Sequence, residues 1–189
     1  MSSVLMTPPA VEPISLEEAK AFLRVETSDE DAIIASLIAS ARIHVEAQAQ
    51  LALVTQQWRI VLDCWPAHGR IAVRPGPLRG VTAARVFDFD GETRAVDTQS
   101  LVPDKGSSML AFMPWMLPMP TRIAAGIEID VTVGFGDSAA DVPEPLRQAV
   151  RLYVAHWYEN RAVLAAEGAT VALPSSAAGL IAPFRMLSL

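Results

Sequence analysis

Few residues in this sequence have the types and spacing that chemistry requires. Residues 134–139, Gly-Phe-Gly-Asp-Ser-Ala, match the glycine spacing with which a loop cradles the pyrophosphate of a dinucleotide. That fingerprint needs a strand, a tight turn and a helix in immediate succession. Here predicted hairpins precede the glycines, and a proline-marked helix follows only several residues later. A glycine-rich exit from a strand is therefore the better interpretation.

Metal ligands and nucleophiles are also scattered. Residues 88–92, Asp-Phe-Asp-Gly-Glu, look like the beginning of a calcium loop, but the later ligands and flanking helices of an EF-hand are missing, so a hairpin turn is expected. His44, His68 and His156 are far apart in the sequence and have no zinc-binding spacing. Cys64 is the single cysteine, which excludes an intrachain disulfide. We therefore expect no enzymatic activity, no cofactor and no metal.

The composition is that of a folded, acidic protein. The 189 residues are 51% hydrophobic and 19% charged, which fits one domain or one domain with a sizeable insertion. The formal net charge is −6 and the only lysines are Lys20 and Lys105, so the sequence lacks the clustered basic residues that general DNA binding requires. Prolines break the longest apolar stretches, and neither a signal peptide nor a membrane span is predicted.

Two stretches after residue 13 have the periodicity of helices. Ser15 stands three residues before a glutamate, which is capping-box spacing and predicts a short helix that begins there. Ser28 is the expected N-cap of a second, strongly amphipathic helix of about twenty residues. Ile33 and Ile43 fall outside its apolar stripe and indicate a second buried contact. The stripe itself consists of Ile34, Leu37, Ile38, Ala41, Val45 and Ala49.

Alternation with period two replaces the helical pattern from residue 55. Residues 57–62 alternate between polar and apolar side chains as in a half-buried strand, and residues 127–133 repeat the pattern. Asp141 is the expected N-cap of a third helix, and a last short helix is expected over residues 175–182. Residues 1–13 carry three prolines and are predicted to form an extended arm.

These elements together predict an α+β fold in a single domain, residues 1–189. A small helical bundle, with three long helices and a short C-terminal one, would be built from residues 14–53 and 141–185. A β-rich insertion, residues 54–136, would lie between the second and third helices. The bundle therefore requires helices from the two ends of the chain to meet.

Residues 113–120, Met-Pro-Trp-Met-Leu-Pro-Met-Pro, form an apolar segment that its prolines keep out of any regular element. Two interpretations stay open for it. The segment folds back over the sheet, or it forms an exposed surface for a partner, because large apolar loops rarely remain in water in a monomer. Its candidate contact residues are Trp115, Met116 and Leu117.

Five sequence blocks, taken in order, resemble the head–tail connector (adaptor) proteins of tailed bacteriophages and of prophage-derived gene transfer agents. The resemblance extends from Ile14 to Arg185, which is nearly the whole chain. The blocks are ISLEEAKAFLRV, SDEDAIIASLIASARIHVEAQ, TQQWRIVLDCWP, GFGDSAADVPEPLRQAVRLYVAHWYENR and LIAPFR.

The resemblance implies a structural virion protein without catalysis, assembled in the bacterial cytoplasm. Twelve copies would form a ring beneath the portal protein, at the head–tail interface. The ring would extend the DNA channel, through which DNA passes without specific binding, and would offer a platform to a tail-side stopper or terminator protein. We expect the C-terminal tail to dock on the portal or on a neighbouring copy, with the contact residues Pro183, Phe184, Arg185, Met186, Leu187 and Leu189.

Two alternatives to a connector stay open. One is a tail-completion or stopper protein, which would share the absence of catalysis but would contact the tail rather than the portal. The other is a small-molecule-binding α+β domain, which would have a discrete pocket with convergent polar groups near Gly134–Asp137.

Overall fold

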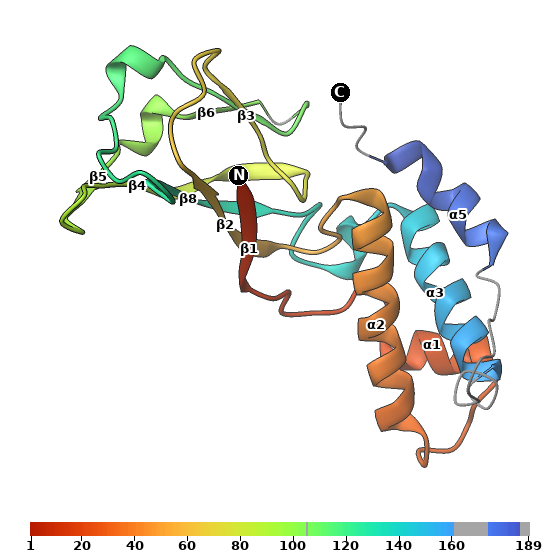
Figure 1. Ribbon diagram of the computed structural model, residues 1–189. Coiled ribbons are helices and arrows are strands. Elements are labelled where there is room, and N and C mark those ends of the chain that lie inside the picture. The colour runs from red at the N-terminus through yellow and green to blue at the C-terminus, as the bar shows by residue number, and fades with distance from the viewer. Residues whose placement is uncertain (105, 161–173, 186–189) are drawn as a thin grey trace, which may run out of the picture. The chain divides into compact units, whose positions relative to one another are not determined.

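The computed structural model describes residues 1–104, 106–160 and 174–185. Figure 1 shows α-helices and antiparallel strands that occupy different parts of the chain, so the predicted α+β class is confirmed. The chain divides into two compact units, each assembled from two separate stretches of sequence. We describe these as the β unit and the helical unit.

The β unit comprises Met1–Pro9 and Thr55–Gly134, and its main element is a five-stranded antiparallel sheet with the strand order β1-β2-β8-β4-β5. Ile60 on β2 lies opposite Ile129 on β8, and both side chains are fully buried. The strands predicted at residues 57–62 and 127–133 are therefore confirmed. The strand bounds are β1 Ser2–Thr7, β2 Gln56–Leu62, β8 Ile127–Val133, β4 Leu78–Phe87 and β5 Thr93–Ala95.

The amino terminus is an edge strand rather than only an extended arm. Ser3 lies opposite Ile60 in an antiparallel β1–β2 pair. All three prolines of this stretch come after residue 7, so residues 2–7 keep the backbone N–H groups that a strand needs. The β-rich part is consequently more than an insertion between helices, since it also recruits the start of the chain.

The other face of this sheet carries a charged cross-strand network. Arg59 on β2 lies directly opposite Asp130 on β8, and its Nε atom is 2.6 Å from the Asp130 carboxylate. Arg85 on β4 reaches the same carboxylate at 2.6 Å, and both arginines contact Glu128 at 3.1 Å. The hydrogen bond from Arg59 is the largest of the effects that lower the pKa of Asp130, with a further contribution from Arg85. The network therefore fixes the register of the three central strands.

A second, three-stranded antiparallel sheet with the order β3-β7-β6 lies in the same unit. The Trp65 ring packs against Phe112 with the ring centroids 5.2 Å apart, and the Trp65 indole N–H donates to the Pro118 carbonyl at 2.8 Å. These contacts tie the apolar segment 113–120 to the core of the β unit. The strands are β3 Arg70–Ala72, β7 Met109–Ala111 and β6 Val102–Asp104.

The helical unit comprises Ala10–Val54 and Phe135–Leu189. Figure 1 shows α2 alongside α3 and α3 alongside α5, and α1 packs against both α2 and α3. Its buried core includes Ile38, Val45, Leu146, Tyr153 and Ile181. The helix bounds are α1 Leu16–Leu23, α2 Asp31–Ala49, α3 Glu144–Glu159 and α5 Ser175–Ile181.

The capping box predicted at Ser15 is confirmed. The Ser15 hydroxyl accepts from the Glu18 N–H at 3.1 Å, and the Glu18 carboxylate accepts from the Ser15 N–H at 2.9 Å. The helix ends after eight residues, where Arg24 adopts a left-handed conformation with φ 61°. The predicted count of three long helices is not confirmed, because α1 is this short.

Two predicted N-caps are wrong. Ser28 does not cap α2, because its carbonyl accepts from the Asp31 N–H in a turn that precedes the helix, and Glu30 occupies the N-cap position. Asp141 does not cap α3, because its carboxylate accepts from the Ser138 N–H and closes a 3₁₀ turn over Ala139–Asp141. Ser28 forms its turn through the main chain and Asp141 forms its turn through the side chain, so residues suited to capping predict helix starts only to within a few residues.

The second buried contact predicted for Ile33 and Ile43 is not found within the described chain. The two side chains are 46% and 57% exposed. The main stripe of α2 is buried as predicted, with the exception of Leu37, which is half-buried. The helix therefore has a buried face and a second, solvent-facing surface that is also apolar.

Replacing Ser15 with alanine tests the capping box. The variant loses the hydroxyl that accepts from the Glu18 N–H, so we expect the free energy of unfolding to fall by about 1 kcal/mol. Urea unfolding followed by circular dichroism measures the change. Ser40→Ala, in the middle of α2, is the control and should change stability by less than about 0.5 kcal/mol. An equal loss in both variants would contradict the capping role of Ser15.

Candidate protein-interaction site

An exposed apolar surface lies on the β unit around the segment predicted to contact a partner. Trp115 is 81% exposed and Met116 is 70% exposed. Val102, Met113 and Met119 are also more than half exposed, and we call these five residues the Met–Trp patch. Sequence reasoning missed Val102, which is distant along the chain, and did not single out the two outer methionines.

A groove of about 600 Å³ adjoins this patch. The two share Val102, Met113 and Met116. Methionine side chains are flexible and polarizable, and they suit grooves that accommodate an apolar partner segment. The lining residues are Gln99, Ser100, Val102, Ala111, Phe112, Met113 and Met116.

Leu117 behaves differently from its two neighbours. It is 7% exposed, whereas the 3₁₀ turn Pro114–Met116 presents Trp115 to solvent. Leu117 thus folds back into the β unit as the first interpretation of segment 113–120 predicts, whereas Trp115 and Met116 are exposed and their contact with a partner stays a prediction. Leu117 anchors the segment in the β unit, and the surface available to a partner is formed by Trp115 and Met116.

The predicted C-terminal contact residues lie in the helical unit. Pro183 and Arg185 are exposed, while Phe184 packs partly against the helical core. Met186, Leu187 and Leu189 lie outside the described residues. The two sets of candidate contact residues therefore belong to different units of the chain.

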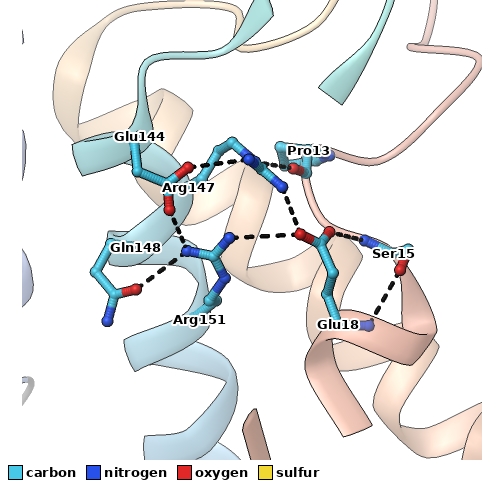
Figure 2. Close-up of polar contacts among 7 residues, drawn as sticks. All are labelled: Pro13, Ser15, Glu18, Glu144, Arg147, Gln148 and Arg151. Atoms are coloured by element: carbon cyan, nitrogen blue, oxygen red, sulfur yellow. Dashed lines mark hydrogen bonds and ion pairs between the residues drawn. The ribbon is translucent and has the colours of Figure 1, made fainter. Parts of the chain in front are cut away.

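A cluster of charged side chains joins α1 to α3 inside the helical unit (Figure 2). The Glu18 carboxylate lies 2.6 Å from Arg147 Nη2 and 3.5 Å from Arg151 Nη2. Glu144 pairs with the same two arginines at 2.9 Å and 2.6 Å. Arg147 Nε also donates to the Pro13 carbonyl at 2.9 Å. Both guanidinium groups are therefore engaged by carboxylates of their own chain.

The cluster keeps its carboxylates ionised. The hydrogen bond from the Ser15 N–H is the largest of the effects that lower the pKa of Glu18. The positive charge of Arg147 lowers this pKa further. The hydrogen bond from Arg151 lowers the pKa of Glu144. Both acids therefore stay charged well below neutral pH and hold α3 against the start of α1.

The weak chemical motifs have structural explanations. A Cβ at Gly136 would lie 2.3 Å from the Asp141 side chain, so the glycine permits the close approach of the 3₁₀ turn. The Asp88 N–H donates to the Glu92 carbonyl at 2.9 Å, and Gly91 has φ 87°, which is the hairpin turn expected there. Across the described ranges, three or more histidine, cysteine, aspartate or glutamate side chains do not come together in a way that could hold a metal ion. The described helices also include none long and apolar enough to cross a bilayer.

The net charge is unevenly distributed between the units. The β unit contains eight basic and eight acidic residues, whereas the helical unit contains seven basic and thirteen acidic residues. The formal charge of −6 therefore belongs entirely to the helical unit.

Comparison with known proteins finds one protein family and several virion structures that are similar to this chain. Residues 13–69 match the family described as phage gp6-like head-tail connector protein. A chain in the neck of an empty GTA (gene transfer agent) particle, computed with C6 symmetry, is 29% identical with a TM-score of 0.80, over 100% of this chain and 97% of that one. The chain resembles head–tail connector proteins. The resemblance predicted from the sequence is therefore confirmed, gene-transfer-agent versions included.

Two further structures of gene transfer agent particles contain chains similar to this one. A chain in the virion of a native gene transfer agent particle is 29% identical with a TM-score of 0.79, over 100% of this chain and 97% of that one. A chain in the neck of a native GTA particle, computed with C12 symmetry, is 29% identical with a TM-score of 0.71, over 98% of this chain and 97% of that one. No curated protein sequence matches. The similarity thus includes both units and connects the chain with structural components of virions.

Replacing Glu18 with glutamine tests the charged cluster. The variant keeps the shape but loses the charge that faces Arg147 and Arg151, so we expect the free energy of unfolding to fall by about 1 kcal/mol at about pH 7. The folded-state pKa of Glu18 lies below the ordinary 4.5, so its contribution is present above pH 4.5 and is lost as the pH falls through the folded-state value.

Urea unfolding of the Glu18→Gln variant at about pH 7 and about pH 3 measures this pH dependence. The difference from the wild type should shrink at the acidic pH. Glu17→Gln, at an exposed position on the same helix, is the matched control and should cost less. A difference that stays constant with pH would show that the ion pairs of Glu18 do not stabilise the unit.

Proposed function

We propose that the chain is a head–tail connector of a tailed bacteriophage or gene transfer agent, located in the neck of the virion. The observation that carries this proposal is the similarity of the whole chain to chains in GTA necks, at 29% identity and a TM-score up to 0.80. The match to the connector family over residues 13–69 supports the same assignment independently. Its role is structural, and no catalytic step is part of it.

Both units act together as one connector domain in this proposal. About twelve copies form a ring beneath the portal protein, extend the DNA channel and offer a platform to a tail-side stopper or terminator protein. The C12 and C6 symmetries of the similar necks support a cyclic arrangement of copies. A cyclic ring requires two different contact faces on each copy, because its interfaces are heterologous.

The Met–Trp patch is the proposed docking surface for another neck protein. Trp115 is the most prominent anchor, because tryptophan contributes more binding energy than most residues when a partner desolvates it. The C-terminal tail from Pro183 onward is the second proposed contact, with the portal or with a neighbouring copy.

The acidic helical unit gives the channel a proposed electrostatic role. The whole net charge of −6 resides in this unit, and a ring multiplies it by the number of copies. Where such a surface faces the lumen, like-charge repulsion discourages DNA from sticking during passage. The DNA then passes without specific binding.

Co-purification with the candidate portal protein of the same source tests the connector function. We expect a stable complex in which electron microscopy finds a ring of this chain on the narrow end of the portal. Binding to the tail-side protein alone, with the portal folded and intact, would favour the stopper reading. Binding to neither protein would contradict the connector function.

Replacing Trp115 and Met116 together with alanine tests the docking surface. The two side chains are largely exposed, so we expect an unchanged melting temperature and at least roughly tenfold weaker binding to the neck partner that docks there. Calorimetry or interferometry with the portal and with the tail-side protein measures the affinity. Phe89→Ala removes another aromatic residue, 83% exposed and outside the patch, and should bind normally. Equal affinity of the double variant and the wild type would contradict the assignment.

A further inference from the structure

The outer face of α2 carries no charged side chain along most of the helix. We define this face by six exposed residues, Ala32, Ile33, Ser36, Ser40, Ile43 and Ala47. A helix surface that faces water normally carries charged and polar residues opposite its buried stripe. On α2 that opposite side consists of alanine, serine and isoleucine.

The charged residues of α2 lie outside this face, and each of them forms an ion pair. Asp31 lies 2.6 Å from Lys20. Arg42 is only 8% exposed and pairs with Glu12 at 2.8 Å and with Glu46 at 2.9 Å. The outer face is therefore free of charge over about 24 Å of helix.

The two serines on this face do not need water. Ser36 Oγ donates to the Ile33 carbonyl at 2.7 Å, and Ser40 Oγ donates to the Ser36 carbonyl at 2.8 Å. Because both hydroxyl protons are bonded within the helix, the face can be buried without leaving a donor unsatisfied. The spacing of Ile33, Ser36, Ser40, Ile43 and Ala47 alternates between three and four residues, as in the seam between two packed helices.

The charge of the molecule indicates what covers this face. The helical unit carries the entire net charge of −6, so a contact made by the helical units of two copies is least opposed where their surfaces lack charge. We infer that the outer face of α2 is one of the two contact faces through which neighbouring copies of this chain pack in a ring. This inference rests on the proposed connector function, and the C12 and C6 symmetries of the similar necks support a second copy as the occupant.

Photo-crosslinking tests the inference on the intact chain. Benzoylphenylalanine is placed at position 43, and in a second variant at the exposed position 17 on α1 as the control. Each protein is mixed with the portal protein, irradiated and analysed by denaturing electrophoresis and mass spectrometry. We expect dimers and higher multimers of this chain from position 43 and few from position 17. Products joined to the portal, or a link within one chain, would overturn the inference.

Charge substitutions at the same position give an independent readout. Ile43→Glu and Ile43→Lys should each lower the number of copies bound per portal by roughly tenfold. Both substitutions place a charge in the proposed contact between neighbouring copies, from which water is excluded. Their melting temperatures should stay near that of the wild type, because Ile43 is 57% exposed. Ile123→Glu, at a 94% exposed isoleucine of the β unit, is the matched control. Normal ring occupancy in both Ile43 variants would overturn the inference, whereas failure of the wild type to bind the portal would instead overturn the connector function.

Discussion

The contact between Glu18 on α1 and the two arginines of α3 is the polar junction that fixes how the two ends of the chain meet in the helical unit. Glu18 and Arg147 are 129 residues apart in the chain, and the β unit is formed by most of the sequence between them. Because Glu18 also closes the capping box at Ser15, one carboxylate both starts α1 and holds α3 against it. The same helices share an apolar core, to which α1, α2, α3 and α5 all contribute.

The pairing of charges inside the chain explains where partners can bind. Arg59, Arg85, Arg147 and Arg151 are all bound by carboxylates of their own unit. These four guanidinium groups are thus occupied in holding strands and helices together. Two of the exposed surfaces of the described chain are apolar, the Met–Trp patch and the outer face of α2. In the proposed connector, these uncharged surfaces are the ones that can be buried against other proteins at the least electrostatic cost.

Much of the fold could be predicted from the sequence because its signals are local. The capping box at Ser15, the buried stripe of α2 and the alternation in β2 and β8 each follow from side chains a few residues apart. The pairing of residues 2–7 with β2 could not be predicted in this way, because an edge strand depends on its partner. The prediction that Ser28 and Asp141 are N-caps is wrong, because both residues take part in turns just before a helix.

The interaction surfaces were only partly predictable for a related reason. The composition of residues 113–120 indicated an apolar surface, but only the three-dimensional structure separates exposed Trp115 from buried Leu117. Val102 joins the same patch through β6, which sequence spacing does not reveal. For α2, the off-stripe residues Ile33 and Ile43 predicted an additional buried contact, but both side chains are exposed in the described chain, so the structure does not confirm that contact.

The most direct test of the connector assignment is an electron cryo-microscopy map of the neck of the particle that contains this protein. We expect a cyclic ring of density beneath the portal that fits copies of this chain, with the outer face of α2 buried between neighbours. A neck whose rings fit other proteins only, or copies of this chain in a different part of the particle, would contradict it.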